Sequence, residues 1–433
     1  MARSFLNRAV KALRVASFVA AMASVEKVMR RHYPEALHAL KAALAVTAVG
    51  CLNDNTQPTA LIFVALSGAG KTLVVMLITP APTDPVLARV FYRSDKFTAA
   101  SFVSHKADVD IEKLQEIDLL PRIKNKTMMT KELSPVLNGN TDELRDRYAV
   151  LTSVLDGQGF TSDSGAHGRH GYDEPINFQW LGATTPLQPE ALEIMSQVGA
   201  RLVFYDTNRS RKDIDDLTAY AADPARNEHF ATCHDAVQQF LRTFYEAVPR
   251  GSVHSSEVTF SPRRIRLLAL WAQVLAALRA PVTRGRPGTL QAGQIIDVAV
   301  EYPERMVGVL KNIAVGSALI HDRTAVDDYD LAQVGHIALS SGVASRAKVL
   351  RALLRLDGRA TSSEIMDEVG LTRPTVLKAM RELEAVGLAR IAKLVNNVLR
   401  AVLDQPFNEL CKAPLLETVD RKAKRGEGGK GHA

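Results

Sequence analysis

Apolar residues follow two different periods along this chain, and the boundaries between them predict its fold. Between about residues 34 and 210, short continuous apolar runs alternate with longer stretches in which apolar side chains recur every third or fourth position. Short runs are typical of buried strands, and the longer stretches are typical of amphipathic helices. This alternation predicts a parallel sheet with flanking helices. We expect strands at 59–66, 90–92, 126–130, 177–181 and 201–205, and helices at 33–49, 71–78 and 142–155.

The same criterion separates further segments from the α/β core of residues 34–211. Residues 1–33 have the pattern of an amphipathic helical segment, which we expect to pack on that core. From 212 to 342 strand signals nearly vanish, which indicates a helical second domain. Its expected helices are 229–247, 261–279, 303–319 and 328–340, with an interruption rich in Pro, Gly and Arg at 281–288.

The pattern over 343–410 predicts a winged helix-turn-helix. A helix over 345–356 precedes the capping box Thr361-Ser-Ser-Glu364, which opens a second helix. A Gly-Leu-Thr-Arg-Pro turn leads into a third helix over 373–386, and Gly387 ends it. The segment 388–403 reads as a hairpin with Asn396-Asn397 at its turn. Helix, helix, turn, helix and hairpin wing in this order are typical of a DNA-binding module.

The third helix of this module is the predicted recognition helix. If it enters a major groove, we expect four side chains on its outward face, namely Arg373, Thr375, Lys378 and Arg381. The acidic residues Glu382 and Glu384 would dilute that face. They leave open the alternative of a winged helix that contacts another protein.

The run Ser67-Gly68-Ala69-Gly70-Lys71-Thr72, between the strand 59–66 and the helix 71–78, predicts a phosphate-binding loop. Backbone N–H groups at the helix start and the helix dipole both attract an anion. Lys71 would reach the β- and γ-phosphates of ATP, and the Thr72 hydroxyl would bind Mg²⁺. One position departs from the usual pattern, because Ala65 stands where a glycine is expected. Alanine is tolerable there if the backbone does not need a positive φ.

Hydrolysis also needs an acidic residue at the end of a strand beside the phosphate loop. Glu132 follows the strand 126–130, and Asp156 follows an apolar run that reads better as the end of a helix. We favour Glu132 as catalytic residue and second metal ligand, although the position before it, often an aspartate, is Lys131. Thr184 and its neighbour Thr185 end the next strand. Thr184 could orient water or touch the γ-phosphate, or the pair could simply form a turn.

Composition adds few constraints. The 433 residues are 46% apolar and 23% charged, as in a globular protein, and the net charge is +7. From Arg421 onward the tail of 411–433 has five basic residues against Glu427, so +4 of the net +7 lies there. We expect this basic tail to be disordered. Three dispersed cysteines favour neither disulfides nor zinc and suggest the cytoplasm. The apolar run 15–23 is too short to span a membrane.

The order of these parts resembles that of an AAA+ ATPase. It is similar to the minichromosome maintenance and superfamily-three helicase branch, and most to ATPases of phages and plasmids, through the segments NKTMMTKELSPVL and LGATTP. The resemblance implies a P-loop NTPase core, a helical lid and a homo-oligomer, as in a hexameric ring. It also implies that Arg201 is an arginine finger for a neighbouring subunit and that Arg305 is a second sensor. Alternatively, each arginine forms an ion pair.

A glycine-rich insert lies between Asp156 and Phe178. In the helicase branch a hairpin in this position reaches into the central pore. By the resemblance, Arg169 and His170, with His167 and Phe160, would contact single-stranded DNA by charge and stacking. His167 and His170 could instead bind a metal, or the insert could be a loop without such a role.

Three functional hypotheses follow. The first is an ATP-hydrolysing DNA motor of the replication type, possessing helicase-like activity. The second is a transcriptional regulator in which a winged helix reads duplex DNA and nucleotide acts as a switch. The third is an inactive remnant that binds ATP without turnover, since Ala65 and Lys131 both depart from the motif pattern.

Overall fold

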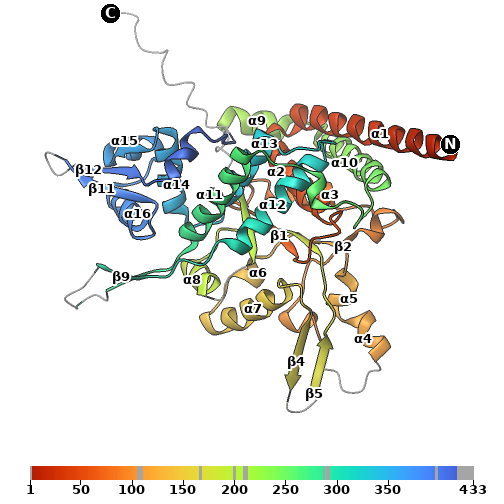
Figure 1. Cartoon of the computed structure of the whole chain (residues 1–433), viewed down its shortest axis with the longest axis horizontal. Coiled ribbons are helices and arrows are strands. Elements are labelled where there is room, and N and C mark those ends of the chain that lie inside the picture. Colours follow the sequence, from red (N-terminus) through yellow and green to blue (C-terminus); the bar gives the residue numbers. More distant parts are fainter. Residues whose placement is uncertain are drawn as a thin grey trace, which may run out of the picture.

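The computed structural model describes residues 2–104, 111–164, 168–197, 201–207, 213–285, 288, 293–394 and 398–416. A central sheet is covered by helices, the winged helix lies at one side, and a hairpin projects from the body (Figure 1). His167, the Asn396-Asn397 turn and the tail from residue 417 lie outside the described residues.

The sheet has five strands, all parallel, in the order β2-β3-β6-β1-β7. The predicted parallel sheet is therefore confirmed. Each predicted strand is present, with its ends moved by a few residues. The strands are β1 (Thr59–Val64), β2 (Phe91–Arg93), β3 (Thr127–Thr130), β6 (Gln179–Thr184) and β7 (Leu202–Asp206).

Both faces of the sheet are buried, because successive side chains along each strand enter different hydrophobic clusters. Leu61 and Phe63 of β1 belong to one cluster, and Ala60 and Ile62 belong to the other. This alternation follows from the period of two in a β-strand. Two-sided burial explains why the β1 sequence is apolar at nearly every position.

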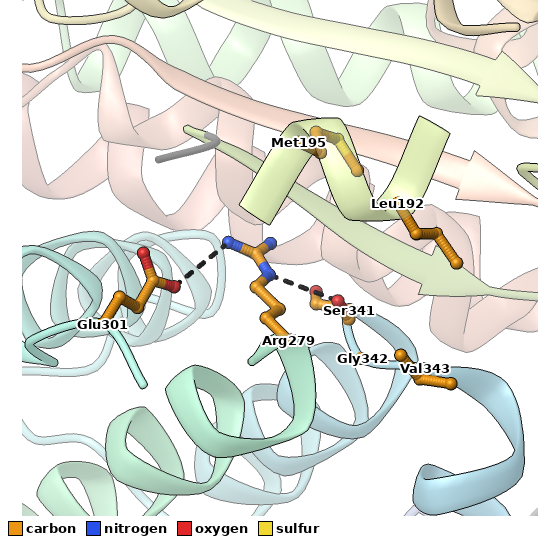
Figure 2. A pocket seen from close by; sticks show the side chains of 7 residues that line it. All are labelled: Leu192, Met195, Arg279, Glu301, Ser341, Gly342 and Val343. Carbon is orange, nitrogen blue, oxygen red and sulfur yellow. Dashed lines mark hydrogen bonds and ion pairs between the residues drawn. The ribbon is translucent and has the colours of Figure 1, made fainter. Parts of the chain in front are cut away.

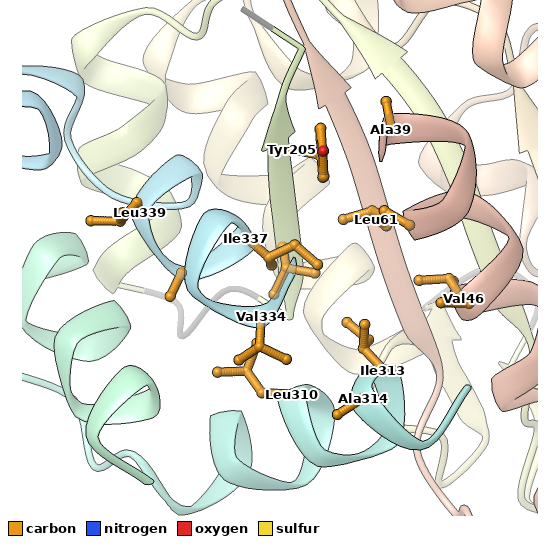
Figure 3. Packing of buried hydrophobic residues seen from close by; sticks show 14 of the residues in the cluster. Ala39, Val46, Leu61, Tyr205, Leu310, Ile313, Ala314, Val334, Ile337 and Leu339 are labelled. Carbon is orange, nitrogen blue, oxygen red and sulfur yellow. The ribbon is translucent and has the colours of Figure 1, made fainter. Parts of the chain in front are cut away.

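The first face is covered by helices that come from both ends of the core sequence. The α2 helix packs on β1 and β6, α12 packs on α2, and α13 lies along β7. Leu61, Ile313 and Ile337 meet in this layer (Figure 3). The helices of this side are α1 (Ala2–His32), α2 (Leu37–Val49), α3 (Lys71–Ile78), α10 (Arg226–Ala247), α11 (Pro262–Arg279), α12 (Glu304–Leu319) and α13 (Asp328–Ser340).

The opposite face is covered by shorter segments. Tyr148 and Leu151 of α7 pack there with Trp180 of β6. The helices of this side are α5 (Leu119–Ile123), which follows α4 (Ile111–Ile117), then α6 (Ser134–Leu137), α7 (Thr141–Val154) and α8 (Pro189–Gln197). The α7 helix confirms that the apolar run before Asp156 is helical.

Two features differ from the expectations for the outer parts of the chain. The N-terminal helix α1 packs mainly on α10, through buried Phe18, Met22 and Val25. The region in which strand signals nearly vanish contains the antiparallel hairpin β8 (Val282–Arg284) and β9 (Ile295–Val298), and β8 lies within the stretch 281–288 that was expected to be an interruption. The α9 helix (Ile214–Ala222) has no buried residue.

The winged helix-turn-helix is confirmed. Thr361 and Glu364 form the predicted capping box, and Gly370 ends its helix with a φ of 66°. The element that the sequence did not indicate is the short strand β10, which pairs with β12. The elements are α14 (Ala344–Arg355), β10 (Arg359–Thr361), α15 (Ser362–Val369), α16 (Arg373–Ala385), β11 (Ala389–Lys393) and β12 (Leu399–Leu403).

The outer edge of β7 is closed by side chains and not by another strand. Arg279 donates to the carbonyl of Leu202, and the Phe204 N–H donates to Ser341 Oγ at 2.8 Å. His336 Nε2 donates to the carbonyl of Asp206, also at 2.8 Å. Because alternate residues of a strand present their backbone groups to the same edge, these contacts bind outward-facing groups at three successive positions of that edge.

We predict that His336 makes the fold sensitive to acid. Its burial, with a smaller effect of Arg351, lowers its pKa from 6.5 to about 3. At pH values between these two pKa values, the unfolded chain binds more protons than the folded chain. The contribution of His336 to the free energy of unfolding is therefore fully present above pH 6.5 and is lost as the pH drops. From pH 7 to pH 5 this residue should remove about 2 kcal/mol from the free energy of unfolding.

Denaturant titrations of the wild-type chain and His336→Gln at both pH values measure this contribution. Glutamine retains an N–H donor for the Asp206 carbonyl and does not titrate. Between pH 7 and pH 5, the free energy of unfolding of His336→Gln should fall by about 2 kcal/mol less than that of the wild-type chain. Equal losses in the two proteins would contradict the prediction.

Candidate functional site

The loop between β1 and α3 has the backbone that a phosphate-binding loop needs. Gly68 and Gly70 both have φ of +81°, in the left-handed region that favours glycine. A Cβ built on Gly68 would have nothing within 4 Å, so the space beside it is open. Gly70 is the N-cap of α3, and Ser67, Gly68 and Ala69 precede it on the surface or half-buried. These are the predicted cofactor-binding residues.

Ala65 does not strain the loop. It is not among the non-glycine residues with positive φ, and its side chain is buried. Its N–H donates to the carbonyl of Thr184 at 3.3 Å, which continues the pairing of β1 with β6 beyond the strand. The departure from the usual glycine is therefore compatible with the geometry that the rest of the loop adopts.

Lys71 is buried and forms an ion pair with Glu132. Its Nζ lies 2.9 Å from Glu132 Oε2, although 61 residues separate them. We expected the acid-bearing strand to lie beside the phosphate-loop strand, and this is wrong, because β6 lies between β1 and β3. The lysine side chain spans that extra strand, since the strands are about 5 Å apart.

Glu132 is held by a second group that sequence reasoning missed. Its Oε1 accepts hydrogen bonds from the N–H of Ser134, at 3.0 Å, and from the Ser134 hydroxyl. The same hydroxyl lies 2.7 Å from Thr185 Oγ1 and 3.2 Å from Thr184 Oγ1. A serine two residues after the candidate acid, at the start of a helix, was the available signal.

These contacts set the charge of Glu132. Partial burial raises the pKa of Glu132, but hydrogen bonds from Ser134 and Lys71 lower it by more. The pKa therefore lies below its usual value. The carboxylate is therefore ionised at neutral pH. A buried lysine, a half-buried Thr72 hydroxyl, an ionised carboxylate and a buried Thr184 converge on the glycine loop. This donor set suits a polyphosphate with a hard divalent cation.

Arg201 and Arg305 are not brought to this loop. Arg201 precedes β7, at the end of the sheet opposite the loop, and its Nε lies 2.7 Å from Asp156 Oδ1. Its side chain is 10% exposed, so the expected alternative of an ion pair is realised, in a largely buried form. Reaching a neighbouring subunit would require that pair to break.

Arg305 is exposed in the first turn of α12, near the opposite end of the sheet from the loop. Glu301 just before it pairs with Arg279, which binds Leu202 at the start of β7. Farther along α12, Asn312 donates to Asn55, ahead of β1. A second-sensor role within this chain's own site therefore does not fit the structure.

The glycine-rich insert forms the hairpin that the resemblance implied. Strands β4 (Phe160–Ser164) and β5 (Gly168–Tyr172) pair antiparallel and project from the body (Figure 1). Arg169 is exposed and contacts Asp173, while His170 is half-buried. The two-histidine metal hypothesis involves His167, which lies outside the described residues.

The recognition helix exposes the expected basic side chains, but the predicted position of Glu382 on the outward face is wrong. Arg373, Lys378 and Arg381 are exposed as expected, and Thr375 is half-buried. Thr375 Oγ1 lies 3.0 Å from Thr372 Oγ1. Glu382 does not dilute the outward face, since it is 4% exposed and turns toward the body.

Within the described ranges, no three or more His, Cys, Asp or Glu residues gather in a group suited to a metal ion. In the same part of the chain, no helix has both the length and the apolar character required to cross a bilayer.

Comparisons with known proteins bear mainly on the C-terminal module. A family model described as winged helix-turn-helix DNA-binding matches residues 345–390. No curated protein sequence matches the chain. Among solved structures, the chain is similar to a full-length MCM homolog from Methanopyrus kandleri, at 11% identity and a TM-score of 0.34. The similarity covers 74% of this chain and 62% of that protein, so the chain spans less than two thirds of its length.

We predict that glycine is required at position 70 and not at position 65. A Cβ at residue 70 in the left-handed region costs roughly 1–2 kcal/mol, so Gly70→Ala should weaken nucleotide binding by about 5- to 30-fold. Ala65→Gly should leave binding within about twofold and lower stability by roughly 1–2 kcal/mol, through chain entropy and the loss of a buried methyl group. Titration with a fluorescent ATP analogue and thermal melts measure both. Tighter binding by Ala65→Gly would contradict the prediction.

Proposed function

We propose that this chain is an ATP-hydrolysing DNA-binding protein of the AAA+ type, with a P-loop NTPase core and a winged helix. The observation that carries the proposal is the Lys71–Glu132 pair at 2.9 Å beside an open glycine loop. The ammonium and the carboxylate come from separate strand ends, and they meet where parallel strands deliver their functional groups.

The chain's residues would divide the work as follows. N–H groups from Ser67 to Thr72 cradle the phosphates, and Lys71 exchanges its carboxylate partner for phosphate oxygens. Glu132, released from Lys71 and still held by Ser134, accepts a proton from the attacking water. Thr184, bonded to the same serine, helps to orient that water. Thr72 and Glu132 would hold Mg²⁺, which would neutralise phosphate charge when bound.

The winged helix implies DNA binding. We infer a helicase-like motor of phage or plasmid replication that acts on single-stranded and duplex DNA as a homo-oligomeric ring. The β4–β5 hairpin with Arg169 and His170 is the proposed contact with a single strand. Arg201 would act at a neighbour's site only in a state in which Asp156 has released it.

A nucleotide-switched transcriptional regulator is the second candidate. The observation that favours it is that Glu382 of the recognition helix is buried against the body and ion-paired there. A helix fixed in this way can respond to changes in the core. The two candidates differ in unwinding, which only the motor performs.

We predict different effects for two substitutions at the phosphate site. Lys71→Ala removes a charged hydrogen-bond donor to phosphate and should weaken ATP binding roughly 10- to 100-fold. Glu132→Gln should leave ATP binding within about threefold while hydrolysis falls by roughly 10²–10⁴-fold, since only the base is lost. Phosphate release and equilibrium nucleotide binding are measured with and without single-stranded DNA.

Indifference of the wild-type rate to single-stranded DNA would contradict the motor. A wild-type chain that binds ATP and releases no phosphate would support the inactive remnant. Absence of saturable nucleotide uptake in the presence of magnesium would overturn the whole proposal.

For the DNA interface we predict that Lys378→Ala and Arg381→Ala each weaken duplex binding. Each lost phosphate contact should make the negative slope of log affinity against log salt concentration shallower by about 1. Arg145→Ala on α7, which removes an exposed positive charge outside the winged helix, is the control. Fluorescence anisotropy at several salt concentrations tests this. Equal effects of all three variants would indicate charge attraction without a defined interface.

A further inference from the structure

Glu382 is a buried carboxylate on the recognition helix with two arginine partners from other elements. Arg346 Nε of α14 lies 2.9 Å from Glu382 Oε2, and Arg284 Nη2 of β8 lies 2.9 Å from Glu382 Oε1. The Glu382 side chain is 6% exposed, and that of Arg346 is 5% exposed. Burial raises the pKa of Glu382, but its bonds to Arg284 and Arg346 lower it more, so the carboxylate is ionised.

Arg284 belongs to the body and not to the winged helix. Its hairpin, β8–β9, lies along α16 (Figure 1). The second partner, Arg346, also reaches the body, because its Nη1 donates to the carbonyls of Ala280, at 2.6 Å, and Leu278, at 3.3 Å. The recognition helix is therefore linked to the body by the Glu382–Arg284 ion pair and, through Arg346, by hydrogen bonds to the end of α11.

The same end of α11 contacts the sheet. Arg279, adjacent to Ala280, donates to the carbonyls of Ser341 and Leu202 and pairs with Glu301 (Figure 2). Ser341 in turn accepts the N–H of Phe204 in β7, and it lies only a few residues before α14. Hydrogen bonds, joined by the peptide link between Arg279 and Ala280, thus run from β7, the neighbour of the phosphate-loop strand, to Glu382.

We propose that Glu382 is a positioning residue that locks the recognition helix to the body and makes duplex-DNA affinity depend on occupancy of the phosphate loop. This inference rests on the proposed function and adds its regulation. A shift of β7 relative to α11 and α13 moves the arginine anchors, and the rigid ion pairs pass that movement to α16. Without the carboxylate, the winged helix keeps its own fold and its Arg346 contact with α11, but it loses the ion pair that orients α16 against β8.

The test compares duplex affinity with and without a non-hydrolysable ATP analogue and Mg²⁺, using a short labelled duplex of mixed sequence at one salt concentration. In the wild-type chain the two affinities should differ by about 5-fold or more, the lower end of usual coupling between sites. In Glu382→Gln the ratio should fall to about 1, within twofold, while nucleotide binding remains.

Two further variants separate positioning from stability. Arg284→Gln alters a partly exposed partner in the hairpin and should abolish the ratio as Glu382→Gln does, and the double variant should add nothing. Glu384→Gln, the same change two residues along the helix at an exposed position, should keep the wild-type ratio. Thermal melts establish that each variant is folded.

Two outcomes would overturn the inference. One is a wild-type ratio of 1 in a chain that binds both nucleotide and duplex, which leaves the proposed function intact. The other is a ratio of duplex affinities, with and without nucleotide, that is unchanged from the wild-type value in folded Glu382→Gln and Arg284→Gln. Failure of the proposed function differs from both, because nucleotide or duplex binding is then lost in the wild-type chain itself.

Discussion

Two-sided burial of the parallel sheet is the constraint on which the other features depend. Because β1 contributes alternate side chains to two separate clusters, neither layer of helices can be removed without exposing half of the strand. Parallel strands also end at a common edge. The glycine loop, Glu132 and Thr184 are therefore delivered to the same place by three strands, whatever their separation in sequence.

At that edge, electrostatics and hydrogen bonding explain the arrangement of the site better than proximity along the chain does. Lys71 is buried and pairs with the carboxylate of Glu132, and that carboxylate is fixed by Ser134. A second anion entering the loop would meet a lysine already in place. In the function that we propose, the pair prepares one residue for the phosphate and the other for the attacking water.

Buried arginines connect the sheet with the DNA-binding module. Arg279 closes the edge of β7, and Arg346 closes the end of α11 while it holds Glu382. Such charges are costly to bury unless each one is paired, so they specify one arrangement of the parts. The winged helix is in this sense a component of the body and not a tethered domain.

The sequence alone determined the elements whose signals are local. Periodicity located all five strands of the sheet and the helices around them, and capping residues located the winged helix. The glycine loop was also identifiable, because the positive φ that it needs at two positions favours glycine there. Strand order, the distance from Lys71 to Glu132, the role of Ser134 and the burial of Glu382 were decided only by tertiary structure. Each depends on contacts between segments far apart in the chain, and a lone acid or arginine in a sequence carries no mark of the partner that folding brings to it.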